Sequence, residues 1–271
     1  MTALTIATWN INSVRLRHPL IARWAEDANP DVICLQEIKC QPDQFPRKAF
    51  EQMGYPHQHV VGQKGLHGVA VVSKRPITPL DQHKLCPKHE ARFQRVTIDG
   101  VEIQNFYIPA GGDEPDAEIN PRFAHKLAFL DALETYARER AAETASIVLV
   151  GDLNIAPREH DVWSHKQLLK VVSHTPPETE GLERARTAGG FLDVARELIP
   201  EPEKVYTWWS YRNRDWKKSN RGRRLDHVWV TEPLRERALA AGRDAFRIWD
   251  ETRDWEKPSD HAPVTLRLAG A

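Results

Sequence analysis

Short apolar runs that end in polar residues recur along this chain. The clearest is residues 146–157, in which Ile147 to Gly151 lead into Asp152 and Asn154. A short apolar run followed by polar residues and proline indicates a buried strand that continues into a loop. Side chains two positions apart on an extended backbone point to the same side, so we expect Asp152 and Asn154 to lie together. Taken alone, such residues after a strand more often only start a turn.

Recurrence of the pattern favours a catalytic rim over a simple turn. Strand-like segments with the same character cover residues 4–15, 30–39, 101–112, 223–230 and 258–268. The polar residues at their ends are Asn10, Asn12, Glu37, Tyr107, Asp226, Asp260 and His261. Loops at one rim of a sheet scaffold are the usual place for catalytic residues. We therefore expect these side chains to meet at one edge.

Helical periodicity separates some of these strands. Residues 121–142 repeat apolar side chains at helical spacing, with Pro121 near the first turn. Residues 17–31 predict a second helix, with Pro19 near its start and an end at Asn29. The chain thus runs twice through the order strand, helix, strand and carboxylate.

The remaining segments have weaker local signals. Asp99–Gly100 predicts a hairpin over residues 95–109. Residues 41–60 are expected to form a loop and one short helix. Pro176–Pro177 is expected to break residues 158–200, which are otherwise helix and loop. The sum of the elements favours one α/β domain over residues 1–271, with two mainly antiparallel sheets packed face to face and helices outside.

Composition and charge narrow the class of protein. The chain has 38 Lys and Arg against 38 Asp and Glu, which argues against a non-specific DNA-coating protein but leaves room for a local basic face. The sequence has no apolar run long enough for a transmembrane helix, and we expect no secretory signal. Its three cysteines match neither a disulfide framework nor a zinc site, so a reducing cytoplasm is expected.

Residues 205–224 are basic and rich in aromatic side chains. Seven Lys and Arg residues stand against Asp215 alone, interleaved with five Trp and Tyr residues. One interpretation is an amphipathic hairpin with solvated cations. Because the segment leads into a carboxylate-bearing strand, it also has the composition that binds a nucleic-acid backbone.

Six motifs, taken together, resemble a known family. They are WNINSVR, LQEIK, NFYIP, GDLNIAP, RRLDHVW and SDHAPV, and they occur in this order over residues 4–265. Together they resemble the motif set of exonuclease III-type AP endonucleases, which belong to the endonuclease/exonuclease/phosphatase superfamily. The resemblance implies a four-layer α/β sandwich. It implies Mg²⁺-dependent cleavage 5′ to abasic sites in duplex DNA, with 3′–5′ exonuclease and 3′-end-cleaning activity. It also implies a monomeric, cytoplasmic protein of bacterial type that associates with the nucleoid through DNA.

The resemblance also implies roles for individual residues. Mg²⁺, or Mn²⁺ in its place, would be held by Asn10, Glu37, Asp152, Asn154, Asp260 and His261, with Glu37 as principal ligand. Catalysis would use Tyr107, Asp152, Asn154, Asp226 and His261, with either Asp152 or His261 as general base. DNA would be bound by Asn12, Arg15, Lys39, Trp208, Arg212, Lys217, Lys218, Arg221, Arg223 and Leu225.

Trp208 and Leu225 are expected to line the pocket for a sugar without a base. Arg223 departs from relatives that carry an aromatic residue at this position, and residues 158–180 fit the family pattern poorly. Two alternatives are a superfamily phosphatase that acts on inositol phosphates or lipids, and a non-catalytic nucleic-acid-binding domain. Every expected catalytic position is filled, which argues against the latter, and no membrane-binding segment favours a lipid substrate.

Overall fold

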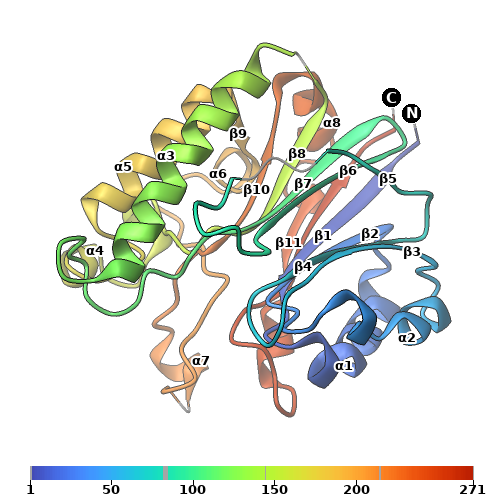
Figure 1. Cartoon of the computed structure of the whole chain (residues 1–271), viewed down its shortest axis with the longest axis horizontal. Coiled ribbons are helices and arrows are strands. Elements are labelled where there is room, and N and C mark those ends of the chain that lie inside the picture. Colours follow the sequence, from blue (N-terminus) through green and yellow to red (C-terminus); the bar gives the residue numbers. More distant parts are fainter. Residues whose placement is uncertain (1, 82–84, 144, 214, 271) are drawn as a thin grey trace.

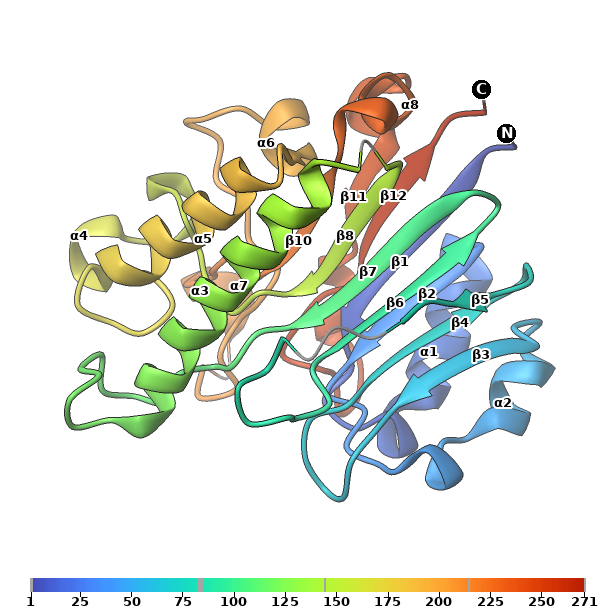
Figure 2. The ribbon, with the colours of Figure 1, turned by 45° about the horizontal axis from the view of Figure 1, so that its top comes forward.

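Two six-stranded sheets pack face to face between two layers of helices. The computed structural model describes residues 2–81, 85–143, 145–213 and 215–270. The strand orders are β11–β12–β1–β2–β4–β3 and β5–β6–β7–β8–β10–β9. Helices α1 and α2 cover the first sheet, and α3 and α5 cover the second (Figures 1 and 2). This arrangement confirms the predicted four-layer α/β sandwich.

The strands of the first sheet are β1 (Leu4–Asn10), β2 (Val32–Gln36), β3 (His57–Val61), β4 (Val69–Ser73), β11 (Phe246–Ile248) and β12 (Val264–Leu268). Those of the second sheet are β5 (Thr78–Pro79), β6 (Phe93–Ile98), β7 (Val101–Tyr107), β8 (Ile147–Asp152), β9 (Leu192–Asp193) and β10 (Asp226–Val230).

The α-helices are α1 (Val14–Ala28), α2 (Arg47–Gln52), α3 (Pro121–Ala141), α4 (His165–Leu168), α5 (Pro176–Ala188), α6 (Val194–Leu198), α7 (Trp216–Ser219) and α8 (Arg235–Leu239). Short 3₁₀ helices cover Pro42–Gln44, Glu159–Asp161, Glu232–Leu234, Gly242–Ala245 and Asp250–Asp254. None of the described helices is both long and apolar enough to cross a membrane.

The repeated strand–helix–strand order forms the centre of both sheets. β1 and β2 are joined by α1 and pair in parallel, and β7 and β8 are joined by α3 and also pair in parallel. The other strand pairs of the two sheets are antiparallel. Both sheets are therefore mainly antiparallel, as predicted, and in each the parallel pair delivers its polar residues to one edge.

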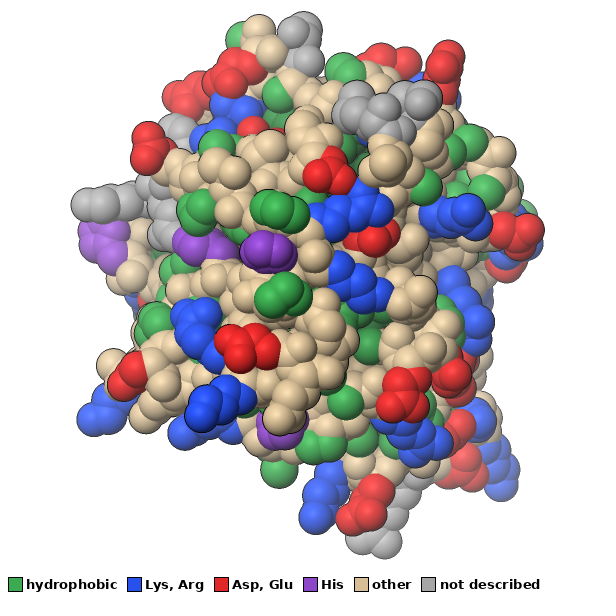
Figure 3. Space-filling model, turned by 90° about the vertical axis from the view of Figure 1, so that its right-hand side faces the viewer, with side chains coloured by type: hydrophobic (Ala, Val, Ile, Leu, Met, Phe, Trp, Pro, Cys, Tyr) green, Lys and Arg blue, Asp and Glu red, His purple; other side chains and the backbone are tan. Residues whose placement is uncertain are grey.

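Apolar side chains fill all three interfaces between the layers. The two faces of β1 contribute to different interfaces. Ile6 faces the other sheet, whereas Trp9 faces the helices. Trp9 packs edge-on against Trp24 of α1, with ring centroids 5.6 Å apart. Phe106 and Leu149 pack beneath α3 and α5 in the same way. On the side of the molecule that carries β3 and α2, acidic and basic side chains are interspersed (Figure 3), in keeping with the zero net charge.

Local predictions were wrong at several points. Helix α1 begins at Val14, so Pro19 lies inside the helix and not near its start. Residues 41–60 were expected to form a loop and one short helix, but the end of this segment belongs to the edge strand β3, His57–Val61. Pro176 and Pro177 occupy the first turn of α5 and begin a helix instead of breaking one, because the first helical N–H groups need no partner within the helix. Residues 205–224 form a hairpin-like excursion, because Trp208 and Arg223 pair through an isolated antiparallel bridge and the short helix α7 lies between them.

Candidate active site

Strand register brings three predicted residues into one row. Tyr107 lies beside Asp152 across the β7–β8 pair, and Asp152 lies beside Asp226 across the β8–β10 pair. Asn10, at the end of β1 in the other sheet, donates from Nδ2 to Asp152 Oδ2 at 2.8 Å and to Glu37 Oε1 at 3.0 Å. Ends of strands from both sheets therefore meet at one site, as predicted.

Glu37 lies directly after β2 and is held as a carboxylate. Its Oε1 accepts from the Tyr107 hydroxyl at 2.8 Å, and Lys39 Nζ lies 2.9 Å from its Oε2. Burial alone would raise the pKa of Glu37, but Lys39 and the hydrogen bonds from Asn10 and Tyr107 outweigh burial and lower it. Burial, followed by the charge of Glu37, raises the pKa of Tyr107 well above its usual range, so the phenol keeps its proton.

Asp152 is almost completely buried and is surrounded by donors. Besides Asn10, it accepts from the backbone N–H of Asn154 at 2.9 Å and from Asn154 Nδ2 at 3.1 Å. Asn154 adopts a left-handed φ of 54°, so the two side chains meet because the chain turns and not because it stays extended. Burial raises the pKa of Asp152 to about 7, although the positive charge of His261 opposes this shift.

His261 lies between two carboxylates. Its Nδ1 is 2.8 Å from Asp226 Oδ2, and its Nε2 is 3.7 Å from Asp152 Oδ2. Burial would lower the pKa of His261, but Asp226 and then Asp152 reverse this effect and raise it to about 10. The ligand atoms of Asp152, Asp226 and His261 lie close enough together to hold a metal ion, although an imidazolium has no free lone pair to offer one.

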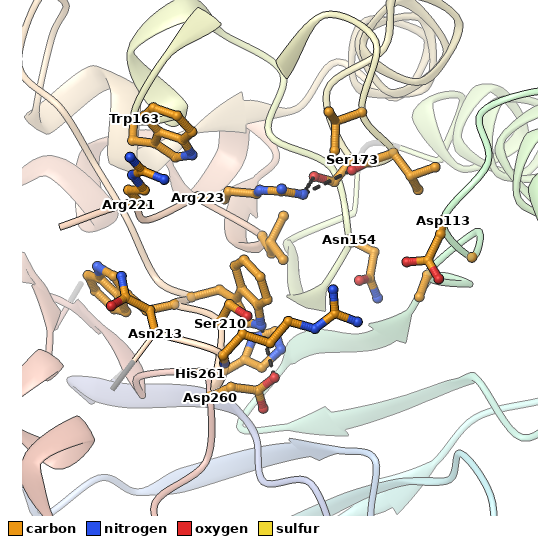
Figure 4. A pocket seen from close by; sticks show the side chains of 18 of the residues that line it. Asp113, Asn154, Trp163, Ser173, Ser210, Asn213, Arg221, Arg223, Asp260 and His261 are labelled. Carbon is orange, nitrogen blue, oxygen red and sulfur yellow. Dashed lines mark hydrogen bonds between the residues drawn. The ribbon is translucent and has the colours of Figure 1, made fainter. Parts of the chain in front are cut away.

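A pocket of about 960 Å³ opens beside this cluster. Trp208 is half-buried in its wall and donates from Nε1 to Asp260 Oδ2 at 2.9 Å. Figure 4 shows Asn154, Asp260, His261 and Arg223 around the pocket. The predicted site residues that line it are Glu37, Asn154, Trp208, Arg212, Arg221, Arg223, Leu225, Asp260 and His261.

Other predicted DNA-binding residues lie outside this lining. Lys217 and Lys218 are exposed on α7, where Lys217 pairs with Asp254. Lys39 Nζ contacts Asn12 Oδ1 at 2.6 Å as well as Glu37, and the exposed Arg15 reaches the backbone oxygen of Lys39 at 3.4 Å. These contacts place Asn12, Arg15 and Lys39 beside Glu37, on the side of the first sheet.

Several residues that support the site had not been predicted. Thr207 Oγ1 donates to Asp226 Oδ2 at 2.6 Å, and Ser259 Oγ donates to the backbone oxygen of Asn10 at 2.6 Å. Lys126 Nζ donates to the backbone oxygen of Asn154 at 2.8 Å. Trp163 and Asp113 also line the pocket. Only Ser259 had a signal in the sequence, because it opens the SDHAPV motif.

The geometry agrees with comparisons to known proteins. Residues 7–261 match the model of the Endonuclease/Exonuclease/phosphatase family, and the chain therefore belongs to this family. Its exodeoxyribonuclease III relative from Haemophilus influenzae is 31% identical over 270 residues, which cover 95% of this chain and 97% of the relative.

Solved structures point to the same branch of the family. An AP endonuclease from Archaeoglobus fulgidus matches with a TM-score of 0.87 and 31% identity, over 99% of this chain and 100% of that one. A 3′ phosphatase from Neisseria, bound to a product DNA hairpin, matches with a TM-score of 0.86 and 32% identity, over 98% and 100%. The resemblance seen in the six motifs is thus confirmed.

Proposed function

We propose that this chain is a DNA-repair nuclease that hydrolyses the phosphodiester 5′ to an abasic site in duplex DNA and also trims and cleans 3′ ends. The observation that carries the proposal is the convergence of Glu37, Asp152 and the His261–Asp226 pair beside a pocket walled by Trp208 and Leu225. Relatives named exodeoxyribonuclease III, AP endonuclease and 3′ phosphatase support it. We further propose that residues 1–271 form one domain that acts as a monomer.

Each side chain has a chemical task in this proposal. The His261 imidazolium binds a non-bridging phosphate oxygen, because Asp226 keeps it charged and Thr207 holds Asp226 in place. Asp152 takes the proton of the attacking water, and Asn154 orients that water. The raised pKa of His261 favours Asp152 over His261 as the base, because a histidine that keeps its proton cannot accept another.

The residues near Glu37 fit a hard divalent cation. The Glu37 carboxylate is ionised and already attracts the ammonium of Lys39, whose flexible side chain can move aside. Glu37 and Asp260 would hold the ion with few protein ligands, as Mg²⁺ prefers, and Mn²⁺ suits the same oxygen atoms. When bound, the ion supplies positive charge to the phosphate and the leaving oxygen.

Recognition of damage follows from the shape of the pocket. Trp208 and Leu225 are both in its wall, and such apolar walls accommodate a flipped sugar that has lost its base. A sugar that still carries a base would have to bring the base into the same space. The proposed specificity therefore depends on exclusion and needs no reading of base edges.

Metal dependence tests this function directly. Chelation should abolish cleavage of a duplex with one abasic analogue, and Mg²⁺ or Mn²⁺ should restore it. Glu37→Gln should then require a far higher metal concentration for half-maximal rate, because an amide is a weaker ligand than a carboxylate. A titration of rate against Mg²⁺ measures this shift. Glu51→Gln, on the exposed face of α2, is the control. Full activity of Glu37→Gln at low Mg²⁺ would refute the assignment.

A second prediction concerns the phosphate contacts proposed for α7. Replacing Lys217 and Lys218 with Ala should weaken binding to damaged and undamaged duplex equally. The slope of log affinity against log salt should fall by roughly one per lost contact. Because Lys217 already pairs with Asp254, we expect Lys218→Ala to account for more of the change than Lys217→Ala.

The control is the adjacent exposed pair Arg47 and Lys48, which lies on α2 away from α7 (Figures 1 and 2). Its double alanine variant should leave the salt slope unchanged. If the α7 variant behaves like this control, α7 does not contact DNA.

A further inference from the structure

Arg223 is a cation in the pocket wall, and within the described part of the chain its hydrogen bonds go to neutral groups. Its Nη1 donates to the backbone oxygen of Val172 at 3.0 Å and to Ser173 Oγ at 2.8 Å (Figure 4). Its guanidinium carbon lies 5.3 Å from the ring centroid of Trp208. Its Nε is buried without an acceptor among the described residues. The guanidinium is thus held in place with its charge uncompensated.

The neighbouring arginine shows the contrast. Arg224 is fully buried and forms ion pairs with Asp161 and Asp193, whereas Arg223 forms no ion pair with any residue that the structure describes. Burial lowers the pKa of Arg223, and only the more distant charge of Glu178 opposes that shift. A half-buried charge is unfavourable unless it is paired, so the missing counter-ion is expected to come from a ligand.

The backbone around Arg223 fixes where that ligand lies. Arg223 forms isolated β-bridges with Trp208 and with Val162, so its position is set by the scaffold. Arg223 and Leu225 line the pocket, whereas Arg224 between them points into the protein. The guanidinium therefore shares a wall with the residues proposed to receive the sugar.

We propose that Arg223 makes this nuclease prefer 3′-terminal groups that carry an additional negative charge over a neutral abasic sugar. These 3′-terminal groups have in common an extra anionic oxygen on the 3′ side of the scissile phosphorus. A 3′-phosphate and a carboxylate-bearing sugar remnant are two examples. A guanidinium binds either anion with charge-assisted hydrogen bonds, and an apolar side chain at this position would bind neither. This inference rests on the proposed nuclease function.

The chemical step itself does not change. The oxygen of water forms a bond to phosphorus as the bond from phosphorus to the 3′ oxygen breaks, and the released 3′ oxygen takes a proton from solvent to become a hydroxyl. The proton that water loses goes to Asp152. Arg223 acts only on the group that remains attached to phosphorus.

The test compares kcat/KM on four duplexes that carry different groups on the 3′ side of the scissile phosphorus. Two carry the extra charge, as a 3′-phosphate and as a 3′-phosphoglycolate. Two do not, as a 3′-methyl phosphate and as an internal tetrahydrofuran abasic analogue. Arg223→Met should lower kcat/KM on the charged pair by about 10- to 100-fold relative to the neutral pair, as expected for loss of a hydrogen bond to a charged group. Arg223→Lys should keep the direction of the preference.

Arg221→Met is the matched control. Arg221 lines the same pocket and lies over Trp163, with its guanidinium carbon 4.6 Å from the ring centroid. Its replacement should lower all four values in the same proportion. Melting curves for each variant verify folding, and Arg223→Lys tests the inference if Arg223→Met does not fold.

The outcomes separate this inference from the function on which it rests. A loss on one charged duplex alone supports the inference and identifies which anion is bound. If the ratio of kcat/KM between the charged and the neutral pair is unchanged in Arg223→Met, whether or not all four values fall, the inference is overturned while the nuclease function stands. If the wild-type protein cleaves none of the four, the nuclease function fails, and the inference fails with it.

Discussion

Asp152→Asn is expected to lower the rate of phosphodiester cleavage by ~10²–10⁴-fold or more, the usual effect of losing a proton-transfer group. The amide cannot accept a proton from water, whereas Asn10 and Asn154 still surround the site. The variant leaves the phosphate contacts proposed for His261 and α7 in place, so affinity for abasic duplex should stay close to that of the wild type. Single-turnover cleavage, with binding measured separately in chelator, gives both quantities.

Asp113→Asn is the matched control for this variant. Asp113 lines the same pocket but makes no contact with Asp152 or His261 that the structure records. Its replacement should leave the rate of cleavage nearly unchanged. If Asp152→Asn instead loses most of its DNA affinity, or melts at a much lower temperature, Asp152 has a structural role and is not the base.

Lys126→Met is expected to lower the free energy of unfolding by roughly 3–5 kcal/mol, because it leaves a buried carboxylate without its partner. Lys126 and Glu178 have fully buried side chains, with Nζ 2.5 Å from Oε1. Glu178 also accepts from the backbone of Ser173 and from the hydroxyl of Thr175. For a domain of this size, such a loss lowers Tm by about 10 °C. Thermal melts measure the effect.

A double variant separates stability from catalysis. Lys126→Met with Glu178→Gln should recover much of the lost stability, because no unpaired charge stays buried and the amide oxygen can still accept from Ser173 and Thr175. It should not recover activity, because the bond from Lys126 to the backbone oxygen of Asn154 is lost in both variants. An unchanged melting temperature for Lys126→Met, or full activity of the double variant, would contradict this account of the pair.

Local physics made the fold predictable to a large extent. The two predicted strand–helix–strand units, residues 4–37 and 101–152, form the parallel pairs of the two sheets. The Asp99–Gly100 turn formed as predicted, with φ of 49° and 77°. Errors occurred where one local signal has two meanings. Proline breaks the interior of a helix, yet Pro176 and Pro177 start α5 and Pro19 lies within α1.

The site was predictable only where its residues lie at or beside the start or end of a strand. The position of Glu37, Asp152 and His261 in such motifs was enough to place them together. Their supporting contacts had no such signal, since Thr207 reaches Asp226 and Lys126 reaches Asn154 only after the layers have packed. That no carboxylate among the described residues pairs with Arg223 is also a property of the folded chain. Sequence showed that Arg223 departs from the family pattern, and only the structure showed what surrounds it.

The most direct test of the central claim is the position and chemistry of the cut in a duplex with one abasic analogue. In Mg²⁺, this account predicts a single incision immediately 5′ to the lesion, with a 3′ hydroxyl on one fragment, and no incision in chelator. Undamaged duplex should be shortened only from its 3′ ends. An intact duplex under these conditions, beside release of phosphate from an inositol phosphate, would contradict the claim and establish the phosphatase alternative.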